Sequence, residues 1–345
     1  MGQPEENPMR SSIVLSVAFV ALSFLCATPA PVSAQEYVLE MGTVVPSGSP
    51  WALQLKRLKK YIEEETGGRV KVKLRLGGSN ERSLARRAQM GSKQGFAGSV
   101  GGLSSIVREV NVLEAPYVFE TVEQADKALD DPEVLKQVRA ILEKQKLVFG
   151  LWGENGFRSY FSRRPIRSPE DMKGIRYRSQ EAVAHVEAYK AIGASPVTID
   201  VANTMTSLQT GVVDGFDNTP LFAMATTWYQ GLDDGERNLF LSKHSYQPGI
   251  VIYSKKWFDT LPADIQKVLL NVPYDLTTWG REQVRKMEPV LIKNLVRYGY
   301  EVHEPTAAEL QKFKDKEKGI PEDIAKQVGP AGQKLLNAVR AALAK

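Results

Sequence analysis

Hydrophobic and polar positions in the first part of the chain alternate in the order of a β-α-β-α-β unit. Strand-like runs have apolar residues at every second position, whereas the helical runs have them three or four positions apart. These strand and helix patterns follow one another over residues 36–45, 50–66, 69–76, 80–91 and 96–100. Ser49 and Asn80 stand where helix caps are expected. The order predicts a parallel sheet with helices on both faces.

A second series of β and α patterns begins near residue 147. Its expected strands cover residues 147–152, 157–162, 174–178, 195–200 and 212–217, with helices at 180–192 and 202–210. A strand and short helix follow at 246–262, and then a mainly helical stretch to residue 298 that Pro273 and Pro289 interrupt. We therefore expect an α/β protein of two lobes, joined by more than one crossing strand.

The N-terminal segment has the three parts of a secretory signal peptide. Residues 13–30 form an uncharged apolar run, and the small residues 32–34 follow it. An uncleaved membrane anchor is the alternative, but Pro29 and Pro31 and the small residues favour removal. We expect residues 1–34 to be a leader that directs export, and no later segment is apolar enough to span a bilayer.

Charge and composition argue against several classes of function. The 345 residues include 45 Lys and Arg and 40 Asp and Glu, interspersed along the chain, so a nucleic-acid partner is not expected. The single cysteine, Cys26, lies in the leader. The three histidines stand far apart, which argues against a zinc site, and no nucleophile elbow is present. We therefore expect no enzyme activity and no cofactor.

Two arginines stand inside predicted strands, beside residues suited to a sheet. Arg158 follows Phe157 and precedes Tyr160, and Arg178 follows Tyr177. Each could form an internal salt bridge or face water at a sheet edge. Alternatively, both could point into a cleft, where a guanidinium matches a carboxylate with two parallel hydrogen bonds. The second reading predicts a receptor for an organic acid.

Three segments resemble one family. They are "FRSYFSRRPIRSPEDMKGIRYR" (157–178), "AIGASPVTID" (191–200) and "SLQTGVVDGFDNTP" (207–220). They are similar to the substrate-binding subunits of tripartite ATP-independent periplasmic (TRAP) transporters of the DctP type. The resemblance implies a periplasmic protein that captures a small organic acid and delivers it to the membrane permease subunits.

The resemblance also implies a periplasmic-binding-protein-like fold. Two mixed or parallel sheets with helices on both faces would be hinged on crossing strands and braced by a long C-terminal helix. The expected parts are lobe I (35–155 and about 245–283), lobe II (156–244 and about 284–310) and a helical tail (311–345). After removal of the leader, this protein would not itself span the membrane.

Residues that match the family's binding motifs are implied as ligand contacts. Arg178 matches the arginine that clamps the substrate carboxylate, and Arg158 stands where several members place a second one. Asn218 matches a polar residue that contacts the ligand. Glu81 and its neighbour Asn80 fall in a loop that helps to define the pocket.

Further candidates are less specific. Trp51 and Phe216 are expected as aromatic walls, with core packing as the alternative for such residues. Ser99 and Ser49 are expected as hydrogen-bond donors, although Ser49 could simply cap a helix. In one branch of the family, the acid at the place of Asp217 helps to bind a metal ion. Asp217 keeps that carboxylate, but the rest of that metal set is not visible here, so no metal is predicted and a metal at Asp217 stays an open alternative.

Departures from the family pattern leave the ligand's identity open. The common "LKIRVP" reads "IRYRSQ" (175–180), and the usual "DGQENP" reads "DGFDNTP" (214–220). The segment "GSVGGLSS" (98–105) is richer in glycine than in many members. Two alternative functions also stay open: a sensor that presents an acid to a membrane receptor, and a binder of a larger, mostly apolar molecule.

Overall fold

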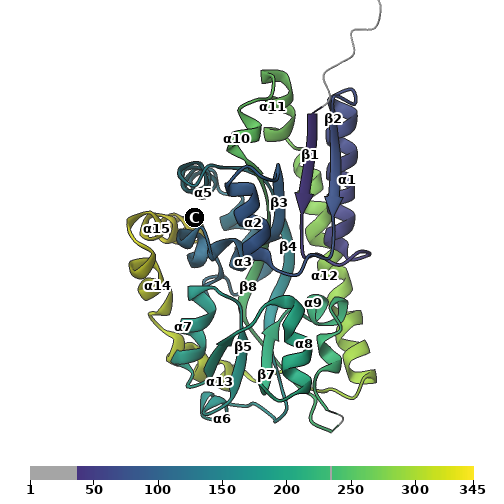
Figure 1. Ribbon diagram of the computed structural model, residues 1–345. Helices are drawn as coiled ribbons and strands as arrows, with labels where there is room; N and C mark the ends of the chain where they lie inside the picture. The colour runs from purple at the N-terminus through teal and green to yellow at the C-terminus, as the bar shows by residue number, and fades with distance from the viewer. Residues whose placement is uncertain (1–36, 234) are drawn as a thin grey trace, which may run out of the picture. The chain divides into compact units, whose positions relative to one another are not determined.

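The computed structural model describes residues 37–233 and 235–345 (Figure 1). The predicted leader lies outside the described residues, so it stays a prediction. The strands are β1 (Tyr37–Gly42), β2 (Val70–Arg75), β3 (Gly95–Ser99), β4 (Leu147–Ser162), β5 (Arg176–Ser179), β6 (Ser195–Thr198), β7 (Gly215–Asn218), β8 (Asn238–Ser254) and β9 (Glu301–His303). They form one sheet in the order β2-β1-β3-β8-β4-β7-β5-β6, with β9 beside β8.

Two long strands connect the two ends of this sheet. β4 and β8 pair antiparallel from Leu147 opposite Ser254 to Ser162 opposite Asn238, with three register shifts between. On one side β3 and β1 lead to β2, and on the other β7 and β5 lead to β6, in parallel pairs. The α/β class and the crossing strands are confirmed. The strands form one continuous sheet instead of two, because β4 and β8 run through both ends.

Helices cover both ends of the sheet (Figure 1). They are α1 (Pro50–Glu65), α2 (Glu81–Gln89), α3 (Val100–Ser104), η1 (Arg108–Glu114), α4 (Val122–Leu129), α5 (Pro132–Lys144), α6 (Pro169–Met172), α7 (Val183–Ala191), α8 (Val201–Gln209), α9 (Pro220–Ala225), η2 (Trp228–Gln230), α10 (Lys255–Phe258), α11 (Ala263–Leu270), α12 (Tyr274–Arg297), α13 (Ala307–Glu317), α14 (Ile320–Val328) and α15 (Pro330–Ala344). The expected long helix is α12. It continues through Pro289 and packs against α1, β4 and α9.

Apolar clusters lie separately at the two ends of the sheet. We call β1, β2 and β3 with α1, α2 and α3 the β1 half, and β5, β6 and β7 with α7, α8, α9 and η2 the β5 half. Leu39 and Leu55 belong to a cluster in the β1 half, and Phe216 and Trp228 to one in the β5 half. Burial of such surfaces is the main stabilising term in each half. Within the described residues, no helix has the length and hydropathy needed to cross a bilayer.

Candidate functional site

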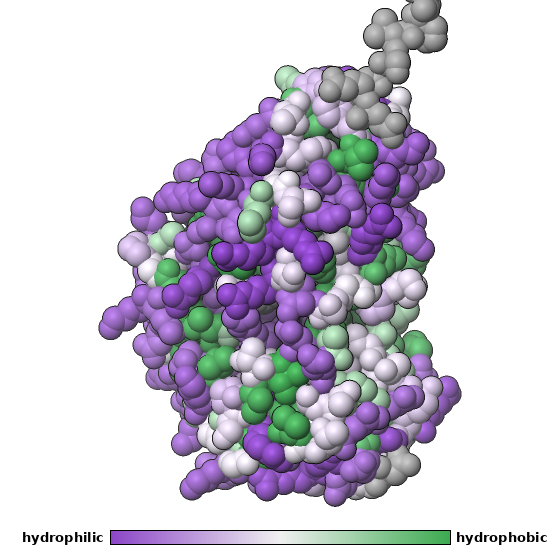
Figure 2. All heavy atoms as spheres, viewed as in Figure 1, coloured by the Kyte–Doolittle hydropathy of each residue, from purple (hydrophilic) through white to green (hydrophobic). Residues whose placement is uncertain are grey.

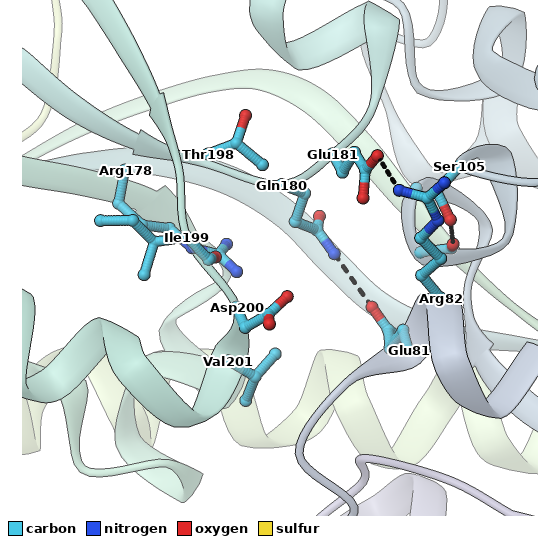
Figure 3. Close-up of a pocket in the computed structure, with 12 residues that line it drawn as sticks. Glu81, Arg82, Ser105, Arg178, Gln180, Glu181, Thr198, Ile199, Asp200 and Val201 are labelled. Atoms are coloured by element: carbon cyan, nitrogen blue, oxygen red, sulfur yellow. Dashed lines mark hydrogen bonds and ion pairs between the residues drawn. The ribbon is translucent and has the colours of Figure 1, made fainter.

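Two small chambers lie between the β1 half and the β5 half, near the carboxyl ends of β3, β5 and β7. The inner chamber encloses about 280 Å³ of empty space and is lined by Val44, Trp51, Glu81, Ser99, Asn155, Arg178, Gln180, Val201, Asn218, Phe222, Trp228 and Gln247. The outer chamber encloses about 360 Å³ and is lined by Glu81, Arg82, Gly101, Gly102, Ser105, Arg178, Gln180, Glu181, Thr198, Ile199, Asp200 and Val201 (Figure 3). Ligand sites of open α/β sheets lie at such strand ends.

Arg178 lines both chambers and forms no ion pair with any residue in 37–233 or 235–345. Its side chain is only 2% exposed, and its Nε donates a hydrogen bond to the carbonyl oxygen of Ile199 at 2.9 Å. The guanidinium carbon lies 4.7 Å from the centre of the Trp228 ring. Among the residues that the structure describes, the buried Nη1 has no hydrogen-bond partner. Burial and the nearby positive charge of Arg158 lower the pKa of Arg178 to about 10, so it stays charged at neutral pH.

Arg158 has the opposite surroundings. Its Nε and Nη2 each donate to a carboxylate oxygen of Asp217 at 2.6 Å, and Nη2 also donates to the Asp217 carbonyl oxygen. Both side chains are buried. Burial opposes a charged guanidinium, but Asp217 outweighs this effect and raises the pKa of Arg158. The internal salt bridge that the sequence left open is therefore present here. Arg158 lines neither chamber, and its contact with a ligand stays a prediction.

Asp217 has no free oxygen to offer a metal ion. Besides Arg158, its carboxylate accepts a hydrogen bond from the hydroxyl of Tyr189 and faces Nε2 of His244 at 3.2 Å. Burial favours the neutral acid, yet Arg158 holds the pKa of Asp217 well below its usual range. No group of three or more His, Cys, Asp or Glu in the described ranges could hold a metal ion. The possibility of metal at Asp217 gains no support from this geometry.

Glu81 is a buried acceptor on the wall opposite Arg178. Its carboxylate accepts from the backbone N–H of Ser99 at 2.7 Å, from the Ser99 hydroxyl at 2.9 Å and from Nε2 of Gln180 at 3.0 Å. Burial raises the pKa of Glu81, and the two Ser99 hydrogen bonds oppose this effect. Because all three neighbours donate, this geometry suits the carboxylate form.

The other predicted contacts fall into two groups. Asn218, Trp51 and Ser99 line the inner chamber, together with Arg178 and Glu81. Asn218 reaches the chamber because it is the last residue of β7. Its Oδ1 accepts a hydrogen bond from the N–H of Thr219 at 2.8 Å. The structure therefore brings five of the predicted residues around one space.

Three other predicted residues, Ser49, Phe216 and Asn80, cap helices or pack in the core. Ser49 caps α1, where its hydroxyl accepts from the N–H of Ala52 at 3.2 Å, as its alternative reading expected. Phe216 stacks on Phe161 in the core at a ring distance of 4.6 Å. Asn80 caps α2. Neither chamber is lined by these residues.

Sequence reasoning did not select several lining residues: Asn155, Gln180, Phe222, Trp228 and Gln247. Gln180 had one signal, because it stands at a departure from the family motif. Trp228 follows a short helix and a residue with positive φ, Thr227, and no pattern marks it as a wall. Its role depends on the tertiary packing of η2 against Arg178.

Polar contacts join α2 to the β5 half across the chambers. Arg82 forms an ion pair with Glu181, and Nδ2 of Asn80 donates to Asp200 at 2.7 Å. Together with the Glu81–Gln180 hydrogen bond, these contacts hold the two sides together. Figure 3 shows the Arg82–Glu181 and Glu81–Gln180 contacts. The middle of the face in Figure 2 is correspondingly dominated by hydrophilic residues. The described structure is therefore a conformation in which the two halves touch.

Comparison with known proteins identifies relatives over most of the chain. The family model "Bacterial extracellular solute-binding protein, family 7" (DctP) matches residues 41–327. A solute-binding protein of Verminephrobacter eiseniae is 30% identical over 215 residues, which are 61% of this chain and 63% of that protein. The C4-dicarboxylate-binding periplasmic protein DctP of Rhodobacter capsulatus is 25% identical and covers 95% of this chain and 97% of its own length.

A solved structure has the same fold. It is the sugar acid binding protein DctPAm of Advenella mimigardefordensis in complex with galactonate, with a TM-score of 0.81 and 25% identity. The alignment covers 89% of this chain and 99% of that one. These three relatives are named as binding proteins.

Proposed function

Because the chain belongs to family 7 of the bacterial extracellular solute-binding proteins, the DctP family, we propose that it captures a small organic acid in the periplasm. It then delivers this acid to the membrane permease subunits of a TRAP transporter. The permease partner and the periplasmic location follow from the family and from the predicted leader. The acid binds between the β1 half and the β5 half.

The observation that carries this proposal is the guanidinium of Arg178, which is buried without a counterion. A buried charge is costly unless it is paired, and a ligand carboxylate is the partner that a planar guanidinium matches best. The ring of Trp228 packs against one face of the guanidinium and fixes its plane. The free N–H groups of Arg178 therefore point in a defined direction. Asn218 and Ser99, on opposite walls, complete the contacts with the acid.

Binding is coupled to closure of two lobes. The lining residues come from both halves, so a ligand makes its full set of contacts only when the halves approach. Such a ligand stabilises the closed state by its differential affinity for it. β4 and β8, which cross between the halves and carry the register shifts, act as the hinge.

The test is calorimetry with a panel of dicarboxylates, 2-oxo acids, hydroxy acids and sugar acids, after native mass spectrometry of the purified protein. At least one acid binds the wild type. Arg178→Met weakens that binding by roughly 2–5 kcal/mol, since the ligand carboxylate loses the guanidinium that it pairs with. The matched control is Arg176→Met on the same strand, because Arg176 is exposed and already paired with Asp214.

This control retains the wild-type affinity. The proposal is wrong if no acid in the panel binds the wild type, or if Arg178→Met binds the acid as tightly as Arg176→Met does. A sensor that reports to a membrane receptor would share the same pocket. It is distinguished by reconstitution, since only the transport protein supports uptake of the acid with its permease.

A further inference from the structure

The side-chain amide of Gln180 occupies the point where the two halves meet. Its Oε1 accepts from Nη1 of Arg158 at 3.0 Å and from Nε2 of Gln247 at 3.2 Å. Its Nε2 donates to Oε2 of Glu81 at 3.0 Å and to the hydroxyl of Ser99 at 3.3 Å. Both polar atoms of the amide are therefore hydrogen-bonded, to partners on the β1 half and on the crossing strands. Figure 3 shows the hydrogen bond from Gln180 to Glu81.

Gln180 also lies at the junction of the two chambers. The inner and outer chambers share four lining residues: Glu81, Arg178, Gln180 and Val201. With the amide in place, the space open to the centre of a water molecule is about 10 Å³ in the inner chamber and about 30 Å³ in the outer one. Each therefore has room for roughly one or two water molecules.

The glycine-rich segment after β3 accommodates this arrangement. A Cβ atom on Gly101 would lie 3.2 Å from Oε1 of Gln180 and 2.7 Å from a carboxylate oxygen of Glu114. A Cβ atom on Gly102 would overlap the carboxylate of Glu81. Any larger residue at these two positions would thus displace the amide or its partner. The absence of side chains at the two glycines thus leaves the space that the Gln180 amide and the Glu81 carboxylate occupy.

The amide resists displacement by a ligand. Glu81 needs a donor and Arg158 needs an acceptor, and the Gln180 amide supplies both from one group. The carboxylate of a ligand supplies acceptors only, so it cannot replace the contact with Glu81. A ligand carboxylate that pushed Gln180 aside would remove one of the three donors to Glu81, which would keep only its two hydrogen bonds from Ser99, and this loss is unfavourable.

We propose that Gln180 is the residue that sets ligand length, by dividing the space beside Arg178 and limiting the site to short hydroxy acids. This inference rests on the proposed function, and it adds that six-carbon sugar acids are selected against. A short acid places its carboxylate on Arg178, and one of its hydroxyl groups takes the place of a water molecule in the inner chamber. A longer chain would have to pass through the position of the Gln180 amide.

The experiment compares lactate, D-erythronate and D-galactonate by calorimetry on the wild type, Gln180→Ala and Gln180→Met. The wild type binds one of the two short acids more tightly than galactonate. Gln180→Ala joins the chambers and reduces this preference by roughly tenfold or more, the scale expected when a pocket wall is removed. Gln180→Met fills a similar volume without the hydrogen bonds that hold the amide in place, so it retains part of the preference.

Three results would overturn the inference: a wild type that prefers galactonate, a Gln180→Ala protein with unchanged preference, or a Gln180→Met protein whose preference relaxes as much as that of Gln180→Ala. In the last case, the hydrogen bonds and not the volume would set selectivity. Failure of the proposed function has another signature, because then no acid of the wider panel binds the wild type. Thermal unfolding of each variant confirms that it is folded.

Discussion

Arg158 and Arg178 stand on strands that flank the same neighbour, β7, and both are almost completely buried. Arg158 has a complete set of partners in Asp217 and Gln180, whereas Arg178 keeps one backbone hydrogen bond and an aromatic face. The two residues thus carry the same charge in the same layer with different consequences. A buried charge with its own counterion stabilises the fold, whereas a buried charge that forms no ion pair within the described residues is a candidate for ligand binding.

The largest expected effect comes from removing the partner of Arg158. Asp217→Asn leaves the guanidinium buried without a compensating charge, so the free energy of unfolding falls by roughly 3–5 kcal/mol. Urea unfolding without ligand measures this loss.

Arg178→Met is the matched comparison for that experiment. It removes a buried charge that has no counterion, so its unfolding free energy stays at the wild-type level or rises, while acid binding is lost. Equal destabilisation by Asp217→Asn and Arg178→Met would contradict the distinction between the two arginines.

The fold was largely predictable, because hydrophobic periodicity reports local structure. The predicted strand at 69–76 and helix at 80–91 agree with β2 and α2 within about two residues. The join of residues 147–152 and 157–162 into one strand was missed, since Gly153 and Gly156 between them look like a turn. The pairing of both with β8 depends on contacts distant in sequence, which periodicity does not contain.

The site was predictable only in part. Strand-end polar residues such as Asn218 were found because strand ends are recognisable. Whether each arginine forms an internal ion pair or contacts a ligand could not be predicted, because this depends on which acid lies opposite each arginine. Asp217 follows Phe216 in the sequence, and nothing local shows that its carboxylate meets Arg158 on β4. The position of the Gln180 amide likewise could not be predicted, because its hydrogen-bond partners all lie in other elements.

A smaller expected effect is the pH dependence of stability that comes from His244, which contacts the Arg158 partner Asp217. His244 stacks on Tyr160 at 4.1 Å, and its ring nitrogens face Ser242 and Asp217. Burial lowers the pKa of His244 below 6.5; Asp217 opposes this shift, and Arg158 and His185 add to it. The unfolded chain therefore binds this proton more readily, so stability is complete above about pH 6.5 and falls as the pH drops below it.

Urea unfolding at pH 7.5 and 5.5 measures this loss. The wild type loses about 1 kcal/mol more between these values than His244→Gln, which cannot take up the proton. Other acidic and basic groups contribute equally to both proteins, so the difference isolates His244. Parallel pH profiles of the two proteins would refute this assignment.

The smallest effect concerns the ligand side, where Arg82 and Glu181 connect α2 to the β5 half. Their side chains are 47% and 51% exposed, so the pair contributes about 1 kcal/mol at most. Because the contact forms only when the halves meet, its loss lowers the population of the closed state and weakens acid binding a few-fold, without touching the ligand.

Arg82→Gln and Glu181→Gln should each produce this decrease, and the double variant should be no weaker than either one. The effect shrinks at high salt, which screens exposed charges. Asp214→Asn breaks a comparable exposed pair with Arg176 inside the β5 half, so it leaves affinity unchanged. Additive losses in the double variant, or an equal loss in Asp214→Asn, would mean that the ion pair does not act through closure.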